Sequence, residues 1–441
     1  MSSTIARYPY RDLRPDEVSH GADLNRMNGK DRAVHEWYRF VLSFPPHLVR
    51  QYLDHFEAAP GQTVLDPFCG TGTTVVESMR QGLNGIGIEA NPIAYLAASV
   101  KTRWSVDPSH LRSAANAVAE ATLRTLGNAG IRDSGVSSPK RALRVLSADQ
   151  IQLLIRDSIS PLPLHKVMVL LEHIEQSPSD VRDAMRIALA RILPTQIGNL
   201  RFGPEVGIGK LKPDAAVVLP WLNNVDTMAR DLDLIAGSTH GLGKIISGDA
   251  REAGVLLVPG SVDFVITSPP YPNEKDYTRT TRLESVLLGL MNDRKGLRSV
   301  KQGLIRSNTR TSFQGDDDSK YVEGMEVIQE LAAQVEARRI SLGKTSGFEK
   351  QYAKVITHFF GGMARHLAEL RPALRPGAQL AYVVGDQASF FQILIRTGQL
   401  LAEVAEVQGY EVVGIDLFRT RAATATRDEL REEVLLLRNP E

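Results

Sequence analysis

The stretch that decides the fold is residues 62–92, QTVLDPFCGTGTTVVESMRQGLNGIGIEANP. A short apolar run with β character at 63–65 leads into the glycine turn 66–74, and four apolar residues then recur at helical spacing (Val75, Val76, Met79 and Leu83). Residues 85–89 form a second apolar run that ends in a carboxylate. Strand, glycine turn, helix and strand make a βαβ unit, which predicts a parallel sheet.

The last part of the chain returns to the same α/β pattern. Alternating β signals occur at 244–249 and 262–267, and a long helix is predicted over 352–370. Two β-rich runs, 410–418 and 433–437, close the chain, and the single polar loop between them suits an antiparallel pair. The predicted fold class is therefore α/β, with a Rossmann-like, mostly parallel sheet that has a terminal antiparallel hairpin.

Segments of different composition surround this α/β pattern. Residues 1–30 are polar with little periodicity, and we expect a leader that is loosely packed or bound to a partner. Residues 104–240 are mostly helical by pattern, which predicts a helical insertion domain. The main domain is then expected in two pieces, 31–103 and 241–441, the second interrupted by a polar insert at 275–350.

Composition excludes several classes of protein. Of the 441 residues, 43% are hydrophobic and 23% are charged, which is typical of a globular protein rather than a disordered one. The net charge is only +1, so any site for a polyanion must be local. The sequence lacks both a membrane-spanning apolar run and a secretory signal, which predicts a cytoplasmic location. The one cysteine, Cys69, excludes an intrachain disulfide and a cysteine-cluster zinc site, and we expect no metal.

The glycine turn has the features of a ligand site. Gly70 and Gly72 would let a ligand approach the backbone, but they lack the further glycine of a dinucleotide fingerprint and the Gly-Lys-Ser/Thr of a phosphate loop. Asp66 before the turn suits an ammonium group, and Glu89, 23 residues later, can accept both hydroxyls of a ribose. An ammonium and a ribose without a phosphate describe S-adenosylmethionine. A mere tight turn beside a solvated Glu89 is the alternative.

Ser268-Pro269-Pro270-Tyr271 directly follows the strand predicted at 262–267, so it should lie at the carboxyl edge of the same sheet. The two prolines stiffen the backbone and leave carbonyls exposed as hydrogen-bond acceptors, which suit an exocyclic amine. Tyr271 offers a ring on which a base could stack, and Ser268 offers a hydroxyl. A plain loop or a partner-binding segment is the alternative for such a sequence.

The two motifs together, DPFCGTGTT at 66–74 and TSPPY at 267–271, resemble the DNA amino-methyltransferase family, specifically its N4-cytosine type. The resemblance implies a methyltransferase sheet, S-adenosylmethionine as cofactor and double-stranded DNA as partner, with a cognate restriction endonuclease or other defence-system proteins as further partners. By this resemblance the target base is held by Ser268, Pro269, Pro270 and Tyr271. The resemblance does not assign the target-recognition region: the insertion at 104–240 is our candidate, and the insert at 275–350 is the alternative.

The resemblance also implies which residues hold the cofactor. The segment from His35 to Pro46 is similar to the family segment that closes over the methionine part, and Asp249 in SGDAR is similar to the residue that reads the adenine amine. The implied cofactor residues are Phe44, Pro46, Asp66, Pro67, Phe68, Gly70, Gly72, Thr73, Thr74, Glu89 and Asp249. Many members of the SPPY type place the base motif first, whereas here the cofactor motif comes first.

Chemistry separates the candidate reactions. Methylation of carbon 5 of a pyrimidine needs a cysteine nucleophile, and the only thiol, Cys69, lies in the cofactor turn. Transfer to an exocyclic amine needs no covalent intermediate, but the base must be extruded from the duplex at a cost of a few kcal/mol. Ser268 favours cytosine N4 by resemblance, while adenine N6 stays the alternative. A catalytically inactive nucleic-acid-binding relative is a second alternative, against which the intact turn argues.

Two cationic segments are candidates for contact with DNA phosphates. Residues 294–310 carry six cations and no acidic residue, and we predict phosphate contacts from Arg298, Lys301, Arg306 and Arg310. Arg201 and Lys210, within the helical insertion, form the second candidate. A solvated surface is the alternative for both segments.

Overall fold

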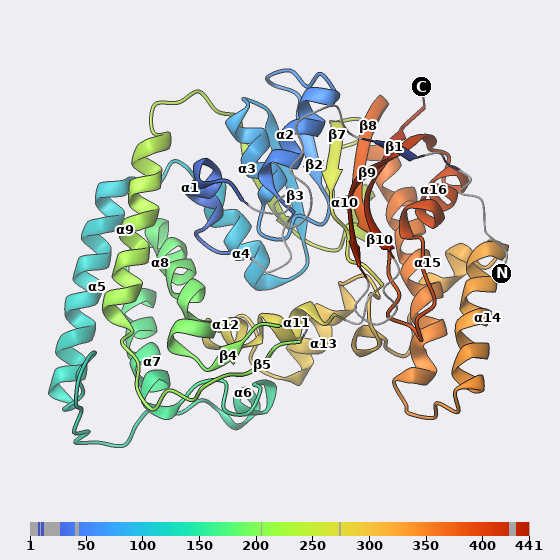
Figure 1. Ribbon diagram of the computed structural model, residues 1–441. Helices are drawn as coiled ribbons and strands as arrows, with labels where there is room; N and C mark the ends of the chain where they lie inside the picture. Colours follow the sequence, from blue (N-terminus) through green and yellow to red (C-terminus); the bar gives the residue numbers. More distant parts are fainter. Residues whose placement is uncertain are drawn as a thin grey trace.

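An eight-stranded sheet forms the centre of the molecule (Figure 1). The computed structural model describes residues 8, 10–12, 27–39, 44–203, 205–272, 275–422 and 429–440. The strands lie in the order β1-β9-β10-β8-β7-β2-β3-β6. Their bounds are β1 Tyr10–Asp12, β2 Thr63–Asp66, β3 Asn84–Glu89, β6 Gly243–Ser247, β7 Val262–Thr267, β8 Leu374–Gly385, β9 Glu411–Ala422 and β10 Glu429–Arg438.

The direction of the strands confirms the predicted Rossmann-like fold. Strand β10 runs antiparallel to both β8 and β9, and the other neighbouring pairs are parallel. Strand β1 differs from the expectation for the leader, because it adds to the sheet beside β9 in the register Tyr10↔Ile415. Nearby, the Tyr8 amide donates to the side chain of Gln399. Part of the leader is therefore held in the sheet.

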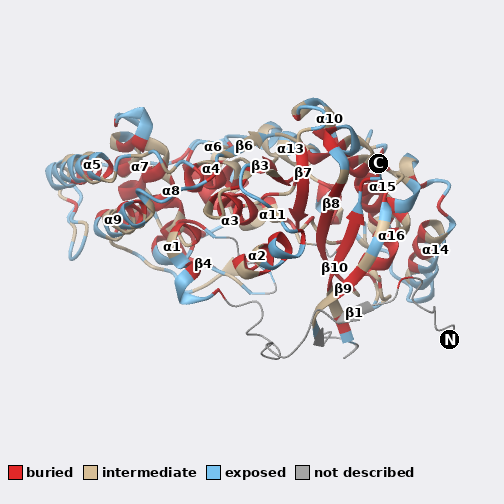
Figure 2. Cartoon of the chain, turned by 90° about the horizontal axis from the view of Figure 1, so that it is seen from above, coloured by how far each residue is buried: buried red, intermediate tan, exposed pale blue. Residues whose placement is uncertain are grey.

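Helices cover both faces of the sheet, and this placement follows from the period of two along each strand. Val64 of β2 packs under α2 (Pro46–His55), whereas Leu65 beside it packs under α15 (Tyr352–Leu370). Helix α15 has the bounds that the sequence predicts. Helices α3 (Thr73–Arg80) and α16 (Thr397–Val407) also contact the strands, which are largely buried (Figure 2), whereas α10 (Ala253–Leu256) and α14 (Glu326–Ser341) pack against α15.

The residues expected as a helical insertion form a helical layer at one end of the molecule, on the left in Figure 1. It holds α5 Pro108–Asn128, α6 Ala148–Leu153, α7 Pro161–Glu175, α8 Ser179–Ile192, α9 Val218–Ile235 and a hairpin of β4 Leu200–Arg201 and β5 Gly207–Ile208. Asp107 caps α5 and accepts a hydrogen bond from the Ser109 amide, as its position before Pro108 predicts. This layer shares one core with α1 (Arg32–His35), α4 (Pro92–Lys101) and α12 (Arg282–Leu287).

The segment expected as a polar insert is only partly polar. It contains α11 (Tyr277–Thr280), α12 and α13 (Arg294–Gln302). All six residues of α12 are buried, because this helix closes the core under the helical layer, whereas no residue of α13 is buried. Among the described residues, no helix is both long and apolar enough to cross a membrane.

Candidate active site

The two sequence motifs meet at one edge of the sheet. Strand β2 pairs with β3 on one side and with β7 on the other, all in parallel, so their carboxyl ends point the same way. Asp66 ends β2, Glu89 ends β3, and Ser268 directly follows β7. The Thr267 hydroxyl donates a 2.6 Å hydrogen bond to Oδ1 of Asp66, which joins the two motifs directly.

Asp66 keeps one oxygen open although it is fully buried. Its Oδ1 accepts from the Thr267 hydroxyl and from the Phe68 amide, whereas Oδ2 has no hydrogen-bond partner within the described ranges. Burial raises the pKa of Asp66 to about 6, against which these hydrogen bonds act. A buried carboxylate with an open oxygen is costly in isolation and favours a cationic partner such as an ammonium. This geometry fits the role that the sequence indicates for Asp66.

The turn after Asp66 needs its glycines. Gly70 and Gly72 have φ angles of 51° and 86°, in the left-handed region that other residues rarely adopt. A Cβ on Gly72 would also lie 3.2 Å from the Cβ of Ala98. Thr74, in the first turn of α3, donates to the Ile266 carbonyl of β7 at 3.0 Å, and Thr73 beside it is buried. The turn is thereby held against the strand that carries the second motif.

Glu89 closes the other side of the turn. Its carboxylate accepts from the Gly70 amide at 2.8 Å and from the Asn91 amide at 2.7 Å. Burial, with a smaller contribution from the negative charge of Asp66, raises the pKa of Glu89 to about 7. A carboxylate has more lone pairs than these two bonds use, so Glu89 can also accept from ribose hydroxyls.

Asp249 is held more tightly than Asp66. Its carboxylate is bound by the guanidinium of Arg251, with Nε 3.0 Å from each oxygen, and Arg251 also pairs with Asp318. Nδ1 of His366 donates to the Ala250 carbonyl at 2.9 Å, and its Nε2 lies 2.7 Å from the Tyr382 hydroxyl. The centroid of its ring lies 4.8 Å from that of the Phe68 ring. These contacts fix the wall of the site near Phe68.

The SPPY motif lies beside β8 at the same edge. The Ser268 Oγ and the Tyr271 hydroxyl are 3.3 Å apart, and Pro269 is buried. A Cβ built on Gly385, at the end of β8, would lie 3.3 Å from Cε2 of Tyr271, so the glycine leaves room for the ring. Ser268, Pro270 and Tyr271 are half-buried and can reach a ligand. Residues 273 and 274 lie outside the described residues.

The segment before α2 is tied to the same unit. His35 lies with Nε2 2.7 Å from Oε1 of Glu77 on α3, and Arg50 of α2 binds the other oxygen of Glu77. Phe44 packs against the cluster under α2, and Pro46 is the first residue of that helix. Residues 40–43, which include Phe40 of the resembling segment, lie outside the described residues.

Cys69 is an inert thiol. Its side chain is buried in the turn, and burial raises the pKa of the thiol well above its usual value. A buried neutral thiol is a poor nucleophile. This agrees with the exclusion of a covalent attack on a pyrimidine ring.

One predicted DNA contact is wrong. Arg306 is fully buried, where it pairs with Asp316, donates to the Lys301 and Gln302 carbonyls and stacks on the Phe313 ring. The sequence could not reveal this, because a run of cations does not indicate which of them meets a carboxylate in the fold.

The other residues predicted to contact DNA differ in how exposed their side chains are. Lys301 bonds Asp276 at 3.0 Å and is largely covered, whereas Arg201, Lys210, Arg298 and Arg310 are exposed. The two cationic segments also meet, since Arg310 lies 3.7 Å from Glu205 in the hairpin connection that follows Arg201. Exposed cations of both segments therefore remain candidates for a shared surface.

Sequence reasoning missed residues that complete the site. Thr267 holds Asp66, and its place as the last residue of β7 was a signal that could have been used. Gly385 and His366 could not have been found, because their contacts with the motifs join segments far apart in the chain.

Comparison with known proteins shows what this chain is similar to. The family model for N6 and N4 DNA methylases matches residues 14–99, which include Phe44, Asp66, the glycine turn and Glu89. M.BsoBI, a type II methyltransferase of Geobacillus stearothermophilus, is 24% identical over 430 residues, covering 90% of this chain and 82% of that protein. The chain is thus similar to DNA amino-methyltransferases, in residues 14–99 by the family model and over most of its length by M.BsoBI.

Two further curated relatives of this chain carry similar names. M.AvaI of Nostoc, a type II methyltransferase, is 23% identical over 444 residues, covering 93% of this chain and 87% of that protein. M.MjaII of Methanocaldococcus jannaschii, also a type II methyltransferase, is 39% identical over 80 residues, covering 18% and 15%. The family implies S-adenosylmethionine as the cofactor and DNA as the substrate, and it includes both N4 and N6 enzymes.

Proposed function

We propose that this amino-methyltransferase is a site-specific enzyme that methylates the N4 amine of cytosine in duplex DNA after extruding the base. The observation that carries the proposal is the hydrogen bond from Thr267 to Asp66, since it sets the SPPY motif directly beside the open carboxylate oxygen. A donor of a methyl group and an acceptor base would thus meet at one edge of the sheet. Methylation of adenine N6 is the second candidate, because a neutral hydroxyl at Ser268 does not reject it chemically.

The cofactor supplies an electrophilic methyl group, and the chain's own residues orient the two reactants. Asp66 would bind the ammonium, and Glu89 would accept the ribose hydroxyls. The Pro269 carbonyl and Ser268 would accept hydrogen bonds from the target amine, which turns its lone pair towards the methyl group. So oriented, the amine nitrogen would take the methyl group from the sulfonium of bound S-adenosylmethionine and would then release one proton to solvent.

The product decides between the candidates. We expect mass spectrometry of digested DNA, after incubation with the enzyme and S-adenosylmethionine, to detect N4-methylcytosine. Ser268→Ala and Tyr271→Ala should lose transfer while still binding the cofactor in calorimetric titrations. N6-methyladenine would overturn the choice of base, and 5-methylcytosine would overturn the mechanism. Full activity in both variants would remove the motif from the active site.

The names of the relatives support a place in restriction and modification. M.BsoBI and M.AvaI are type II methyltransferases, and they align with most of this chain. We therefore propose a cytoplasmic modification enzyme that protects sites from a cognate restriction endonuclease. The test is whether DNA modified in a host that expresses the enzyme resists an endonuclease that cuts the same sequence.

A further inference from the structure

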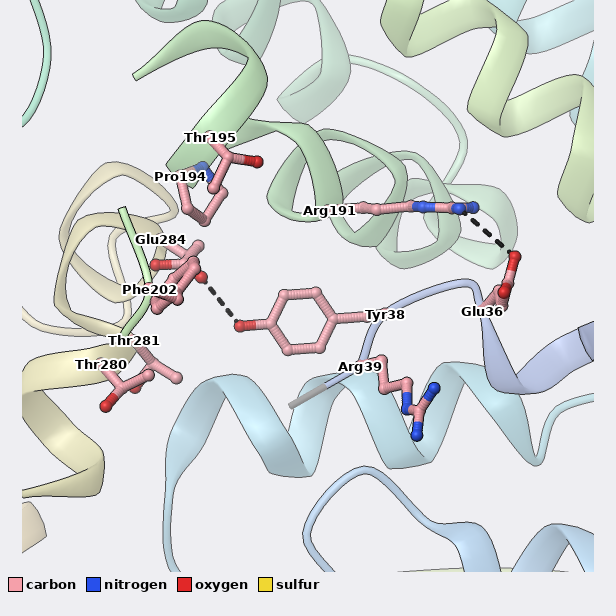
Figure 3. Close-up of a pocket in the computed structure, with 10 residues that line it drawn as sticks. All are labelled: Glu36, Tyr38, Arg39, Arg191, Pro194, Thr195, Phe202, Thr280, Thr281 and Glu284. Atoms are coloured by element: carbon pink, nitrogen blue, oxygen red, sulfur yellow. Dashed lines mark hydrogen bonds and ion pairs between the residues drawn. The ribbon is translucent and has the colours of Figure 1, made fainter. Parts of the chain in front are cut away.

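A cavity outside the proposed transfer site joins the helical layer to the main domain (Figure 3). Its volume is about 250 Å³. The segment after α1, the end of α8, the hairpin and α12 all contribute to its walls, and the lining residues include Tyr38, Arg39, Arg191, Phe202, Thr281 and Glu284. The transfer chemistry proposed above uses none of these side chains, although Tyr38 and Arg39 lie in the 35–46 segment that resembles the one closing over the cofactor.

The inner wall holds a carboxyl group with an open oxygen. Glu284 is 2% exposed, and its Oε1 accepts a 3.0 Å hydrogen bond from the Tyr38 hydroxyl. Its Oε2 has no hydrogen-bond partner in the part of the chain that the structure describes. Burial raises the pKa of Glu284 to about 7. A buried carboxyl oxygen without a partner requires an explanation, and a donor on a ligand provides one.

The outer wall is cationic. Arg39 is exposed and Arg191, on α8, is about one-third exposed, with its guanidinium 3.6 Å from Glu36. Behind them lies Lys101 of α4, which is buried. Burial, and then the positive charges of Arg39 and Arg191, lower the pKa of Lys101 to about 7. An anion between these cations would relieve their mutual repulsion.

The cavity adjoins the surface expected to meet DNA. Phe202, which lines the cavity, directly follows the exposed Arg201 of β4. The same hairpin connection carries Glu205, which pairs with Arg310. The aromatic ring of Phe202 also gives the cavity a stacking face.

We propose that this cavity receives one unstacked nucleotide of the DNA substrate other than the target base, with its base edge at Glu284 and its phosphate at Arg39 and Arg191. The inference rests on the proposed DNA-methyltransferase function. Cytosine, adenine and guanine carry an exocyclic amine that can donate to a carboxylate, whereas thymine lacks one and offers only its ring N3–H. Glu284 therefore selects against thymine at one position of the recognition sequence.

The amino-acid part of the cofactor is the competing occupant, because it too has an anionic and a cationic group. The open oxygen of Asp66 already provides a place for that ammonium at the edge of the sheet. Arg191 and Phe202 moreover come from the helical layer and the hairpin rather than from the glycine turn. The position and the aromatic ring both favour a nucleotide.

The test compares the sequences modified by wild-type enzyme and by Glu284→Gln. A library of DNA randomised around the recognition site is methylated at pH 8, above the pKa of Glu284 of about 7, and the modified sites are sequenced. We expect discrimination against thymine at one position to fall roughly 5- to 150-fold, which corresponds to about 1–3 kcal/mol. Glu120→Gln, an exposed residue of α5, is the matched control and should keep the wild-type profile.

Further variants keep the inference testable if Glu284→Gln does not fold. Tyr38→Phe removes only the hydroxyl that orients Glu284 and should relax the same position more weakly. Arg191→Ala should lower the log–log salt dependence of DNA binding by about one unit, as loss of one phosphate contact does. Calorimetric titration with S-adenosylmethionine should give affinities within about twofold of wild type for Glu284→Gln and Arg191→Ala.

Each other outcome has a distinct meaning. Weaker cofactor binding with an unchanged sequence profile would assign the cavity to the cofactor and overturn the inference. Unchanged profiles together with an unchanged salt dependence would overturn it as well. A wild-type enzyme that modifies no DNA would reject the proposed function, and the inference would fall with it.

Discussion

Two of the places where this chain buries charged groups differ in the partners that the fold supplies. At the edge of the sheet, Asp66 is buried with one open oxygen, and burial raises its pKa to about 6. In the insert, Asp316 is also buried, but there Arg306 and His358 face its two oxygens. Burial alone would raise the pKa of Asp316, yet His358 and Arg306 more than offset this and leave the pKa well below its usual range.

This difference indicates how a ligand-binding carboxylate can be told from a carboxylate in a structural ion pair. Charge and burial are common to both places, so neither property identifies a ligand site. The distinguishing feature is a lone pair that the folded chain leaves without a donor. By this criterion Asp66 and Glu284 are candidates for ligand contact, whereas Arg306 and Asp316 serve the fold.

The largest expected effect is a loss of stability when the ion pair between Arg306 and Asp316 is broken. Arg306→Ala should destabilise the protein by about 3–5 kcal/mol in denaturant unfolding, because it leaves the Asp316 carboxylate buried without its partner. Arg310→Ala, an exposed cation of the same segment, should change stability by at most about 1 kcal/mol. A stable Arg306→Ala protein with weaker DNA binding would restore the phosphate contact that the cationic run predicted.

The next largest effect is the loss of cofactor affinity when the Asp66 carboxylate is removed. Asp66→Asn should weaken S-adenosylmethionine binding by about 1.5–3 kcal/mol, roughly 10- to 150-fold, because it removes the charged partner of the ammonium. Calorimetric titration measures the affinity, and Asp226→Asn on the exposed face of α9 is the control. If the Asp66 variant keeps wild-type affinity, the open oxygen does not bind the cofactor.

Protonation of the Asp66 carboxyl should have a smaller effect on the affinity for S-adenosylmethionine. Burial raises the pKa of Asp66 to about 6, so the carboxyl is ionised above pH 6 and neutral below it. An ammonium binds the ionised form, so affinity for S-adenosylmethionine should fall up to about tenfold for each pH unit below 6.

Two variants separate the carboxyl groups in this pH dependence. The decline near pH 6 should disappear in Asp66→Asn and persist in Glu89→Gln, since the pKa of Glu89 lies near 7. Titrations from pH 5 to pH 8 measure it. An identical profile in wild type and Asp66→Asn would assign the dependence to another group.

The smallest effect concerns the exposed cations near the hairpin. Arg201→Ala and Arg310→Ala should each reduce the log–log slope of DNA affinity against salt by about 0.9. Between 50 and 200 mM salt this is less than about 1 kcal/mol for each contact. Arg124→Ala, an exposed cation of α5, should leave the slope unchanged. Equal slopes in all three variants would identify the Arg201 and Arg310 surface as merely solvated.

Local pattern allowed the parallel sheet to be predicted well. The strand at 262–267 and the helix at 352–370 have the predicted bounds, because period-two and period-3.6 patterns report which residues face a core. The pairing of the leader with the sheet could not be predicted in this way. Strand β1 has only three residues, which are too few to show a period-two pattern, and its partner β9 lies far away in the chain. Likewise, the polarity around α12 concealed a buried helix.

The sequence by itself determined the βαβ unit, the residues that the cofactor turn requires and the exclusion of a thiol mechanism. Those conclusions depend on neighbours along the chain: a glycine at a left-handed turn, a carboxylate at a strand end and a single cysteine. Only the tertiary structure decided which buried charges have partners. Asp66 meets Thr267, Arg306 meets Asp316 and Tyr38 meets Glu284, and the second of each of these pairs is placed by the fold. A hydrogen bond depends on distances of about 3 Å, which residue type and sequence spacing do not specify for segments far apart in the chain.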